Sequence, residues 1–176
     1  GFKNEGAAFI AEATALKRKI QEGFFDNKTK FYFDITIDRK KHINIYGPEG
    51  LIPLWAMAAT QTEAESIQKV IFDSDKFYTR VPFPTISADH PKLDINGYWR
   101  GPVWLDQAYF GIMGLRYYGY VRQARKLTER IFDNAKGFIN SGLPIRENYN
   151  PFTGEGLNAN NFSWSAAHLL LLYWGR

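Results

Sequence analysis

Glu147 is the carboxylate in this sequence whose surroundings most favour chemistry. It lies in the polar segment PIRENYNPFTG, residues 144–154, between Arg146 and Asn148 and close to a proline turn. A carboxylate at the mouth of a pocket can act as a general base, because it can accept a proton from a bound water. The residues alone leave an alternative open and favour it: a surface glutamate in an ion pair with Arg146.

Two aspartates are further candidates for acid–base chemistry. Asp94 precedes an aromatic segment, and Asp106 follows it in a stretch that is otherwise apolar. A single acidic residue on a buried helix is usually a hydrogen-bonded anchor, because an unpaired buried charge is unfavourable. We therefore expect Asp106 to be structural. The same argument applies to His168, which also falls in an apolar helix and is expected to be a hydrogen-bonded core residue.

The segment NGYWRGPVW, residues 96–104, crowds two tryptophans, a tyrosine and an arginine between turn-forming residues. Aromatic residues make up 16% of the chain, and five of them are tryptophans. Pockets for small ligands, sugars included, are commonly lined by aromatic rings. For any one of these rings, packing in the core is the alternative. Arg100 can clamp a ligand, or it can tie the segment to Asp94 or Glu147.

Composition excludes several classes of function. The chain has no cysteine and its three histidines are far apart, so we expect no disulfide, no metal site and no cofactor. The net charge of +4 comes from short, scattered basic clusters, which favours a solvated surface over a nucleic-acid partner. Neither a bilayer-spanning run nor a signal peptide is evident, so no membrane partner is expected. The compartment stays open, periplasmic or cytoplasmic if the source is bacterial.

Hydrophobic periodicity predicts an all-α chain with a short β hairpin in a loop, near residues 31–37. The expected helices cover residues 5–24, 50–59, 60–71, 103–118, 121–138 and 162–174. The first, third and fifth are amphipathic, whereas the others are apolar on nearly every side and are expected to be buried. Thr60 or Thr62 is expected to open the third helix with a capping box, and Asn160 or Asn161 to cap the last.

Alternating half-buried and buried helices describe a double ring, with inner helices around an axis and outer helices around them. The links from outer to inner helices, residues 25–49, 74–102 and 139–160, are long, and long loops in compact domains are usually functional. In a ring of antiparallel helices these links emerge at the same end. We therefore expect NGYWRGPVW and the 139–160 connection to share one face, which is the candidate site.

Several segments resemble glycoside hydrolase family 63, which includes the processing α-glucosidase of N-glycan maturation and bacterial α-glucosidases. They are GPEGLIPLWA (47–56), PTISADHP (84–91), GYWRGPVW (97–104), ENYNPFTG (147–154) and NFSWSAAHLLLL (161–172). The resemblance covers most of the chain in the right order. It implies an (α/α)6 toroid that cleaves α-glucosidic bonds with inversion, using two carboxyl groups.

The resemblance also implies roles for individual residues. Glu147 matches the position of the family's general base, which activates water, and this reverses the preference drawn from the residues alone. Trp99, Arg100 and Trp104 match a segment that lines the substrate pocket. Tyr149 and Trp164, which flank the base, are expected to shape the sugar site. The substrate would be an α-linked glucoside or oligosaccharide.

The chain departs from the family in one respect. The family's general acid is an aspartate upstream of the SADHP segment, and nothing here matches it. With about six helices instead of twelve, residues 1–176 are expected to form a single partial domain, the C-terminal half of a toroid. Such a chain would pair with another copy or with a missing N-terminal half, and by itself would be weakly active or inactive.

Two alternatives to an α-glucosidase stay open. One is a non-catalytic helical module that binds glycans or proteins, from a truncated gene. The other is a trehalase-like toroid hydrolase that acts on a different α-linked substrate.

Overall fold

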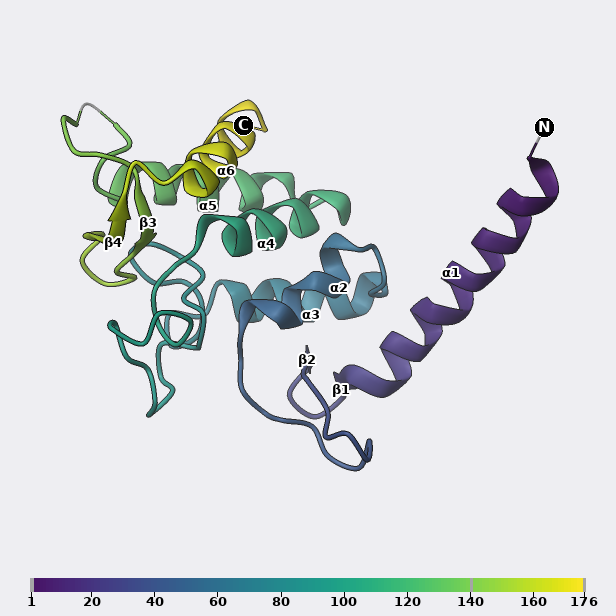
Figure 1. Ribbon diagram of the computed structural model, residues 1–176. Helices are drawn as coiled ribbons and strands as arrows, with labels where there is room; N and C mark the ends of the chain where they lie inside the picture. Colours follow the sequence, from purple (N-terminus) through teal and green to yellow (C-terminus); the bar gives the residue numbers. More distant parts are fainter. Residues whose placement is uncertain (1, 140, 176) are drawn as a thin grey trace.

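The computed structural model describes residues 2–139 and 141–175, and this part of the chain contains six α-helices (Figure 1). They are α1 (Lys3–Phe24), α2 (Ile52–Trp55), α3 (Gln61–Ile71), α4 (Leu105–Tyr117), α5 (Val121–Asn134) and α6 (Ser163–Trp174). A 3-10 turn, η1 (Pro48–Leu51), leads into α2. Two antiparallel strand pairs join β1 (Phe25–Asp26) to β2 (Phe31–Tyr32), and β3 (Arg146–Tyr149) to β4 (Gly156–Asn160).

The all-α prediction is confirmed. Asn140, in the predicted 139–160 connection, and the two terminal residues of the predicted domain lie outside the described residues.

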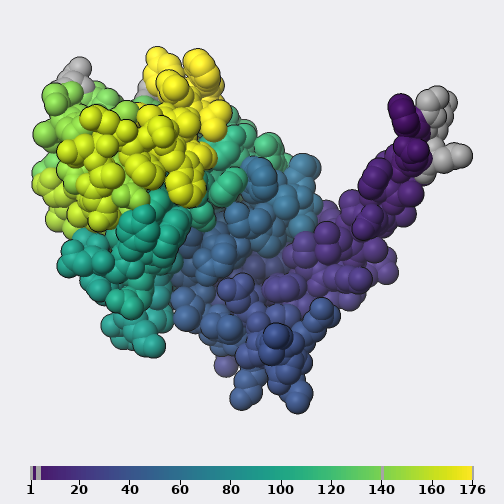
Figure 2. Space-filling model, in the orientation of Figure 1, coloured from purple at the N-terminus to yellow at the C-terminus, as the bar shows by residue number. Residues whose placement is uncertain are grey.

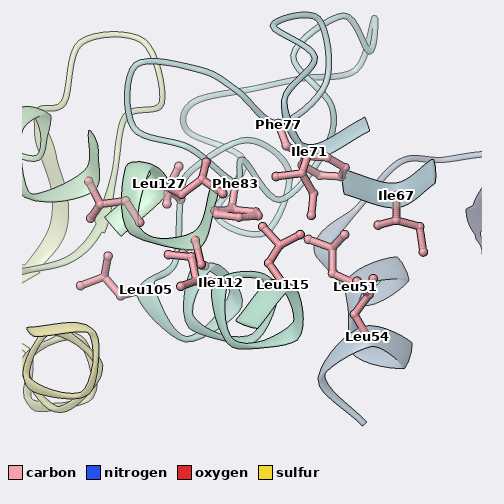
Figure 3. Close-up of a cluster of buried hydrophobic side chains, with 14 of the residues drawn as sticks. Leu51, Leu54, Ile67, Ile71, Phe77, Phe83, Leu105, Ile112, Leu115 and Leu127 are labelled. Atoms are coloured by element: carbon pink, nitrogen blue, oxygen red, sulfur yellow. The ribbon is translucent and has the colours of Figure 1, made fainter. Parts of the chain in front are cut away.

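Helix α4 is the centre of the fold. It packs against α2, α5 and α6, and its buried residues lie on several sides of the helix. Helices α3 and α5 each bury one stripe, because their apolar residues recur at helical spacing while charged residues occupy the other side. Figure 3 shows Leu115 of α4 close to Leu51 and Leu54, in a core that also contains Ile67 and Leu127. The predicted alternation of inner and outer helices is therefore observed around α4.

The second predicted helix, residues 50–59, is shorter than expected. Pro53 fits its first turn, where a missing N–H is tolerated, but Met57 has a φ of 54° and ends the helix. The hairpin prediction over residues 31–37 was also too long, because only Phe31 and Tyr32 form a ladder strand. Periodicity predicted the position of these elements but not the left-handed residue that terminates α2.

The capping box of α3 belongs to Thr60, one of the two predicted candidates. Its hydroxyl accepts a hydrogen bond from the Glu63 N–H at 3.2 Å, and Glu63 accepts one from the Thr60 N–H at 2.6 Å. The Tyr32 hydroxyl donates to the same Glu63 oxygen at 2.9 Å and so ties β2 to the start of α3. For α6 the prediction was wrong: Phe162 occupies the N-cap, without a side-chain cap.

Helices α1 and α6 leave apolar faces uncovered. Helix α1 projects from the body as an arm, as Figures 1 and 2 show, and Phe9 on its predicted buried stripe is 70% exposed. Helix α6 buries Ser165 and Leu172 but exposes Leu171 and Trp174, which corrects the expectation that it is buried on most sides. The helix is apolar nearly all round, and within the described part of the chain its main helical neighbour is α4.

We propose that these faces are covered by further polypeptide, since soluble monomers rarely expose large contiguous apolar patches. A second copy that pairs α1 with α6 twice is the simplest cover, because isologous contacts are self-complementary. Sedimentation velocity on the purified chain should then report a dimer, and Phe9→Glu or Leu171→Glu should shift it to a monomer. The control is Ile37→Glu, a change on a fully exposed loop residue. A monomeric native chain would contradict this pairing.

Candidate active site

Glu147 lies in the middle of β3, and its side chain is 8% exposed. One carboxylate oxygen accepts a short hydrogen bond from the Tyr98 hydroxyl, and the other accepts a hydrogen bond from the Ala159 N–H at 3.2 Å. Its backbone carbonyl accepts a hydrogen bond from the Ser165 hydroxyl at 2.8 Å, which fixes β3 to the start of α6. The carboxylate therefore faces the aromatic segment and is not paired with Arg146, the alternative that the sequence left open.

The aromatic segment reaches Glu147 because its end is bonded to β3. Val103 and Tyr149 exchange two backbone hydrogen bonds, of 2.8 and 3.0 Å. At the base of the loop the Asp94 N–H donates to the Arg100 carbonyl at 2.8 Å. Gly101 passes so close to Asp94 that a β-carbon would lie 2.5 Å from the Asp94 carbonyl oxygen, so the turn requires glycine. These contacts confirm that the two predicted connections meet on one face.

Three tryptophans form an open aromatic surface beside Glu147. Trp104 is 2% exposed and donates its indole N–H to the Tyr98 carbonyl at 3.0 Å. Trp99 stacks on it with ring centroids 3.9 Å apart and planes 7° apart, and remains 46% exposed. Trp164, at the start of α6, is tilted against Trp104 at 5.6 Å and is also exposed. Trp99 and Trp164 thus have exposed ring surface available to a ligand, whereas the buried Trp104 is the ring on which both of them pack.

Arg100 does not approach Glu147 in this arrangement. Its guanidinium forms an ion pair with Asp94 at 3.0 Å, the structural alternative predicted for it. The Asn96 N–H and the Arg100 guanidinium, in that order, hold the pKa of Asp94 below its usual value. Asp94 is therefore a poor candidate for a general base, because its ion pair with Arg100 and its lowered pKa make its carboxylate a weak proton acceptor.

Tyr149 is completely buried, which differs from its predicted contact with sugar. Its ring packs edge-on against Phe138, and its hydroxyl oxygen accepts a hydrogen bond from the Arg146 N–H at 2.8 Å. Burial raises the pKa of this hydroxyl to about 12. A side chain without exposed surface cannot contact a ligand, so Tyr149 serves to position β3.

The two remaining candidates, Asp106 and His168, lie on helices. Asp106 is buried in the first turn of α4 and accepts a hydrogen bond from the Gln107 amide at 2.7 Å, consistent with an anchor. His168 is half-buried, its Nδ1 lies 2.9 Å from the Trp164 carbonyl, and its ring meets Tyr109 edge-on. Both residues are engaged in local contacts, as expected, but His168 is only half-buried and is not the core residue that the sequence predicted.

Sequence reasoning missed the residues that hold Glu147. Tyr98 was part of the noticed aromatic segment, and its hydroxyl offered a donor, but nothing in its position indicated the partner. Ala159 contributes only its backbone N–H, which leaves no signal in residue type. Ser165 follows the predicted start of α6 and could have been read as a local cap, whereas it bonds to β3.

Glu147 and the aromatic segment lie apart from two cavities beside α1. Cavities of about 360 and 490 Å³ flank α1, one against residues 56–58 and the other against residues 35–42, and neither is lined by β3 or the aromatic segment. Among the described residues there is no group of three acidic or histidine side chains placed to hold a metal ion. No helix in the described part of the chain could span a membrane. The arrangement offers one oriented carboxylate beside aromatic rings, which suits a base acting near a sugar.

Comparison with known proteins identifies a family. Residues 1–165 match the model of the mannosylglycerate hydrolase MGH1-like glycoside hydrolase domain. The mannosylglycerate hydrolase of Thermus thermophilus is 29% identical over 88% of this chain and 35% of its own length. Mannosylglycerate hydrolase MGH1 of Selaginella moellendorffii is 32% identical over 69% of this chain and 24% of its own. The chain thus spans about a third or less of these relatives.

Solved structures agree with this match. A family 63 mannosylglycerate hydrolase from Thermus thermophilus, crystallised with glucose, has a TM-score of 0.72 and 29% identity over 88% of this chain and 37% of its own. The neutral trehalase of Saccharomyces cerevisiae has a TM-score of 0.74 at 22% identity over 91% and 29% of the two chains, which shows a shared fold alone. The predicted resemblance to glycoside hydrolase family 63, and the toroid-type fold that it implied, are confirmed.

The contact between Tyr98 and Glu147 can be tested by titration. The hydrogen bond to Glu147, followed by burial and the negative charge, raises the pKa of the Tyr98 hydroxyl. Glu147→Gln should therefore lower this pKa towards its usual value, because a neutral amide no longer disfavours the phenolate. The measurement is carbon-13 NMR of tyrosine Cζ against pH, with the resonance assigned by its loss in Tyr98→Phe. An unchanged titration in Glu147→Gln would show that the two groups do not interact in solution.

Proposed function

The chain belongs to the family of mannosylglycerate hydrolase MGH1-like glycoside hydrolase domains, and on this premise we propose that it supplies the general-base half of the active site of an inverting glycoside hydrolase. Glu147 is the proposed base. The observation that carries the proposal is the orientation of its carboxylate, which is buried, held by two donors and turned towards the aromatic surface.

Inversion requires a water held by the base on one side of the sugar and an acid on the other. The two carboxyl groups then lie roughly 6.5–9.5 Å apart, which leaves room for that water. Glu147 is buried enough to have a fixed position, whereas the proposed sugar-binding faces of Trp99 and Trp164 remain exposed beside it. In this proposal the general acid comes from polypeptide beyond this chain, so the isolated chain has little or no activity.

Mannosylglycerate is the first substrate to test, because relatives that match most of this chain are named as its hydrolases. An α-glucosidic bond is the second. The mannosyl-oligosaccharide glucosidase of Saccharomyces cerevisiae is 26% identical over 77% of this chain and 19% of its own length. The exposed tryptophans favour either sugar, since aromatic rings can stack on the apolar face of a hexose. Arg100 remains a proposed substrate contact only if its ion pair with Asp94 opens.

Replacing the proposed base tests the function. In the active enzyme that carries this chain, Glu147→Gln should reduce turnover by about 10²–10⁴-fold, because the water is no longer activated. Binding of substrate should be largely kept, since glutamine retains the shape and an acceptor oxygen. The assay is hydrolysis of mannosylglycerate and of α-glucosides, with binding measured by calorimetry.

The matched control is Glu155→Gln, which changes an exposed glutamate between β3 and β4 that pairs with Lys136. It should leave turnover nearly native. Near-native turnover in Glu147→Gln would reject the proposed base. If the chain bound glycans but the native enzyme hydrolysed none of the substrates, the non-catalytic binding module would be the better explanation.

The aromatic surface is tested by comparing its two stacked rings. Trp104→Ala should lower the free energy of unfolding by about 3–5 kcal/mol, the usual cost of truncating a buried aromatic side chain. Trp99→Ala should lower it less, because half of this ring is already exposed, but should weaken sugar binding more. Chemical denaturation and calorimetry measure the two effects. Unchanged sugar affinity in Trp99→Ala, with a large loss of stability, would place this ring in the core.

A further inference from the structure

The strand opposite Glu147 contains an extra residue. Arg146 pairs with Asn160 and Asn148 pairs with Leu157, so a single residue of β3 faces two residues of β4, Asn158 and Ala159. This is a β-bulge, which bends the strand and redirects the groups beside it. Here it redirects the Ala159 N–H, which leaves the regular ladder and donates to the Glu147 carboxylate at 3.2 Å.

Asn158 is the residue that makes the bulge. Its φ is 59°, in the left-handed region that non-glycine residues other than asparagine and aspartate seldom occupy. The next N–H in the chain belongs to Ala159, so the conformation of Asn158 sets the direction of the hydrogen bond to Glu147.

The bulge is fastened to the residues on both sides of Glu147. The Asn158 carbonyl accepts a hydrogen bond from the Arg146 guanidinium at 2.5 Å, and the Asn158 side-chain amide donates to the Asn148 side chain at 2.9 Å. Asn148 is fully buried, so this second contact joins the bulge to the interior. Together with the Ala159 N–H, the bulge thus contacts three consecutive residues of β3.

A second non-glycine residue with a left-handed backbone lies on the other side of the carboxylate. Tyr98, whose hydroxyl donates to the second Glu147 oxygen, also has a left-handed backbone, with a φ of 59°. Unfavourable backbone conformations of this kind persist where the surrounding structure imposes them, and they concentrate at functional sites. Both donors to Glu147 therefore depend on a residue in the same rare conformation.

We propose that Asn158 is a positioning residue for the Glu147 base: its left-handed backbone directs the Ala159 N–H at the carboxylate and fixes the oxygen that would face the attacking water. This inference rests on the proposed function of Glu147 and deepens it. Asn158 itself touches neither substrate nor water in this role. A small displacement of the base is costly, because catalysis depends on its alignment with the reacting atoms.

The matched pair Asn158→Gly and Asn158→Ala isolates the backbone. Both remove the side-chain hydrogen bond to Asn148, but glycine adopts the left-handed conformation freely whereas alanine does not. In the active enzyme that carries this chain, Asn158→Ala should lower kcat about tenfold or more with KM nearly unchanged. Asn158→Gly should restore most of kcat. Equal losses in both variants, or no loss in either, would overturn the positioning role.

A second readout needs no activity. The Ala159 amide lies in an exposed part of β4, and Glu147 is its hydrogen-bond partner, so its hydrogen exchange reports that bond directly. Exchange measured by NMR on the chain should be at least several-fold faster in Asn158→Ala and in Glu147→Ala, and near native in Asn158→Gly. Exchange that is equally slow in Asn158→Ala would overturn the inference.

The two readouts separate this inference from the function on which it rests. If Glu147→Gln keeps native turnover, the proposed base fails, and with it any catalytic role of Asn158, whatever the exchange rates are. If Glu147→Gln is inactive while Asn158→Ala keeps native kcat and slow exchange at Ala159, the base stands and only the positioning role fails.

Discussion

A buried carboxylate must be paired, and in this chain that requirement connects parts that are remote in sequence. Glu147 is almost completely buried, and an uncompensated charge in the interior costs several kcal/mol. Its two donors come from the segment before α4, through Tyr98, and from β4, through Ala159. The packing of α4 against α2, α5 and α6 serves as the frame that brings these connections to one end of the helices. Ala159 reaches the carboxylate through the pairing of β3 with β4, and Tyr98 reaches it because the end of its segment is bonded to β3 through Val103 and Tyr149.

The hydrogen bonds to Glu147 require unfavourable backbone conformations at two residues. Tyr98 and Asn158 both adopt left-handed conformations, which cost on the order of 1–3 kcal/mol at residues that do not tolerate them well. The two backbone hydrogen bonds between Val103 and Tyr149, and the stacking of Trp99 on Trp104, supply contacts that oppose this cost. The tryptophans thus have a structural role as well as exposed faces. This explains why a loop carries such large side chains: one ring forms the support on which the others rest.

The sequence predicted what periodicity and residue type can encode. Helices α3, α4 and α5 alternate between half-buried and buried as expected, Thr60 caps α3, and the aromatic segment reaches Glu147 through Tyr98. The features that the sequence could not predict depend on tertiary contacts, and these leave no pattern in the sequence. The burial of Tyr149 follows from the pairing of β3 with Val103. The bulge at Asn158 depends on the register between β3 and β4. Apolar composition could not show which flank of α6 the described residues leave exposed.

The exposed helices and the open site have a common explanation. Helices α1 and α6 have exposed apolar faces. At the site, the rings of Trp99 and Trp164 are also exposed, next to the single oriented carboxylate of Glu147. In the proposed inverting mechanism the sugar must lie between two carboxyl groups, so the surface described here forms one wall of the pocket. In a ring, the elements that cover the flanks of the helices also complete the mouth. In the intact enzyme, we propose that further polypeptide of the ring covers α1 and α6 and brings the second carboxyl group opposite Glu147. A second copy of this chain could cover the two helices but would not supply that group, because nothing in this sequence matches the general acid.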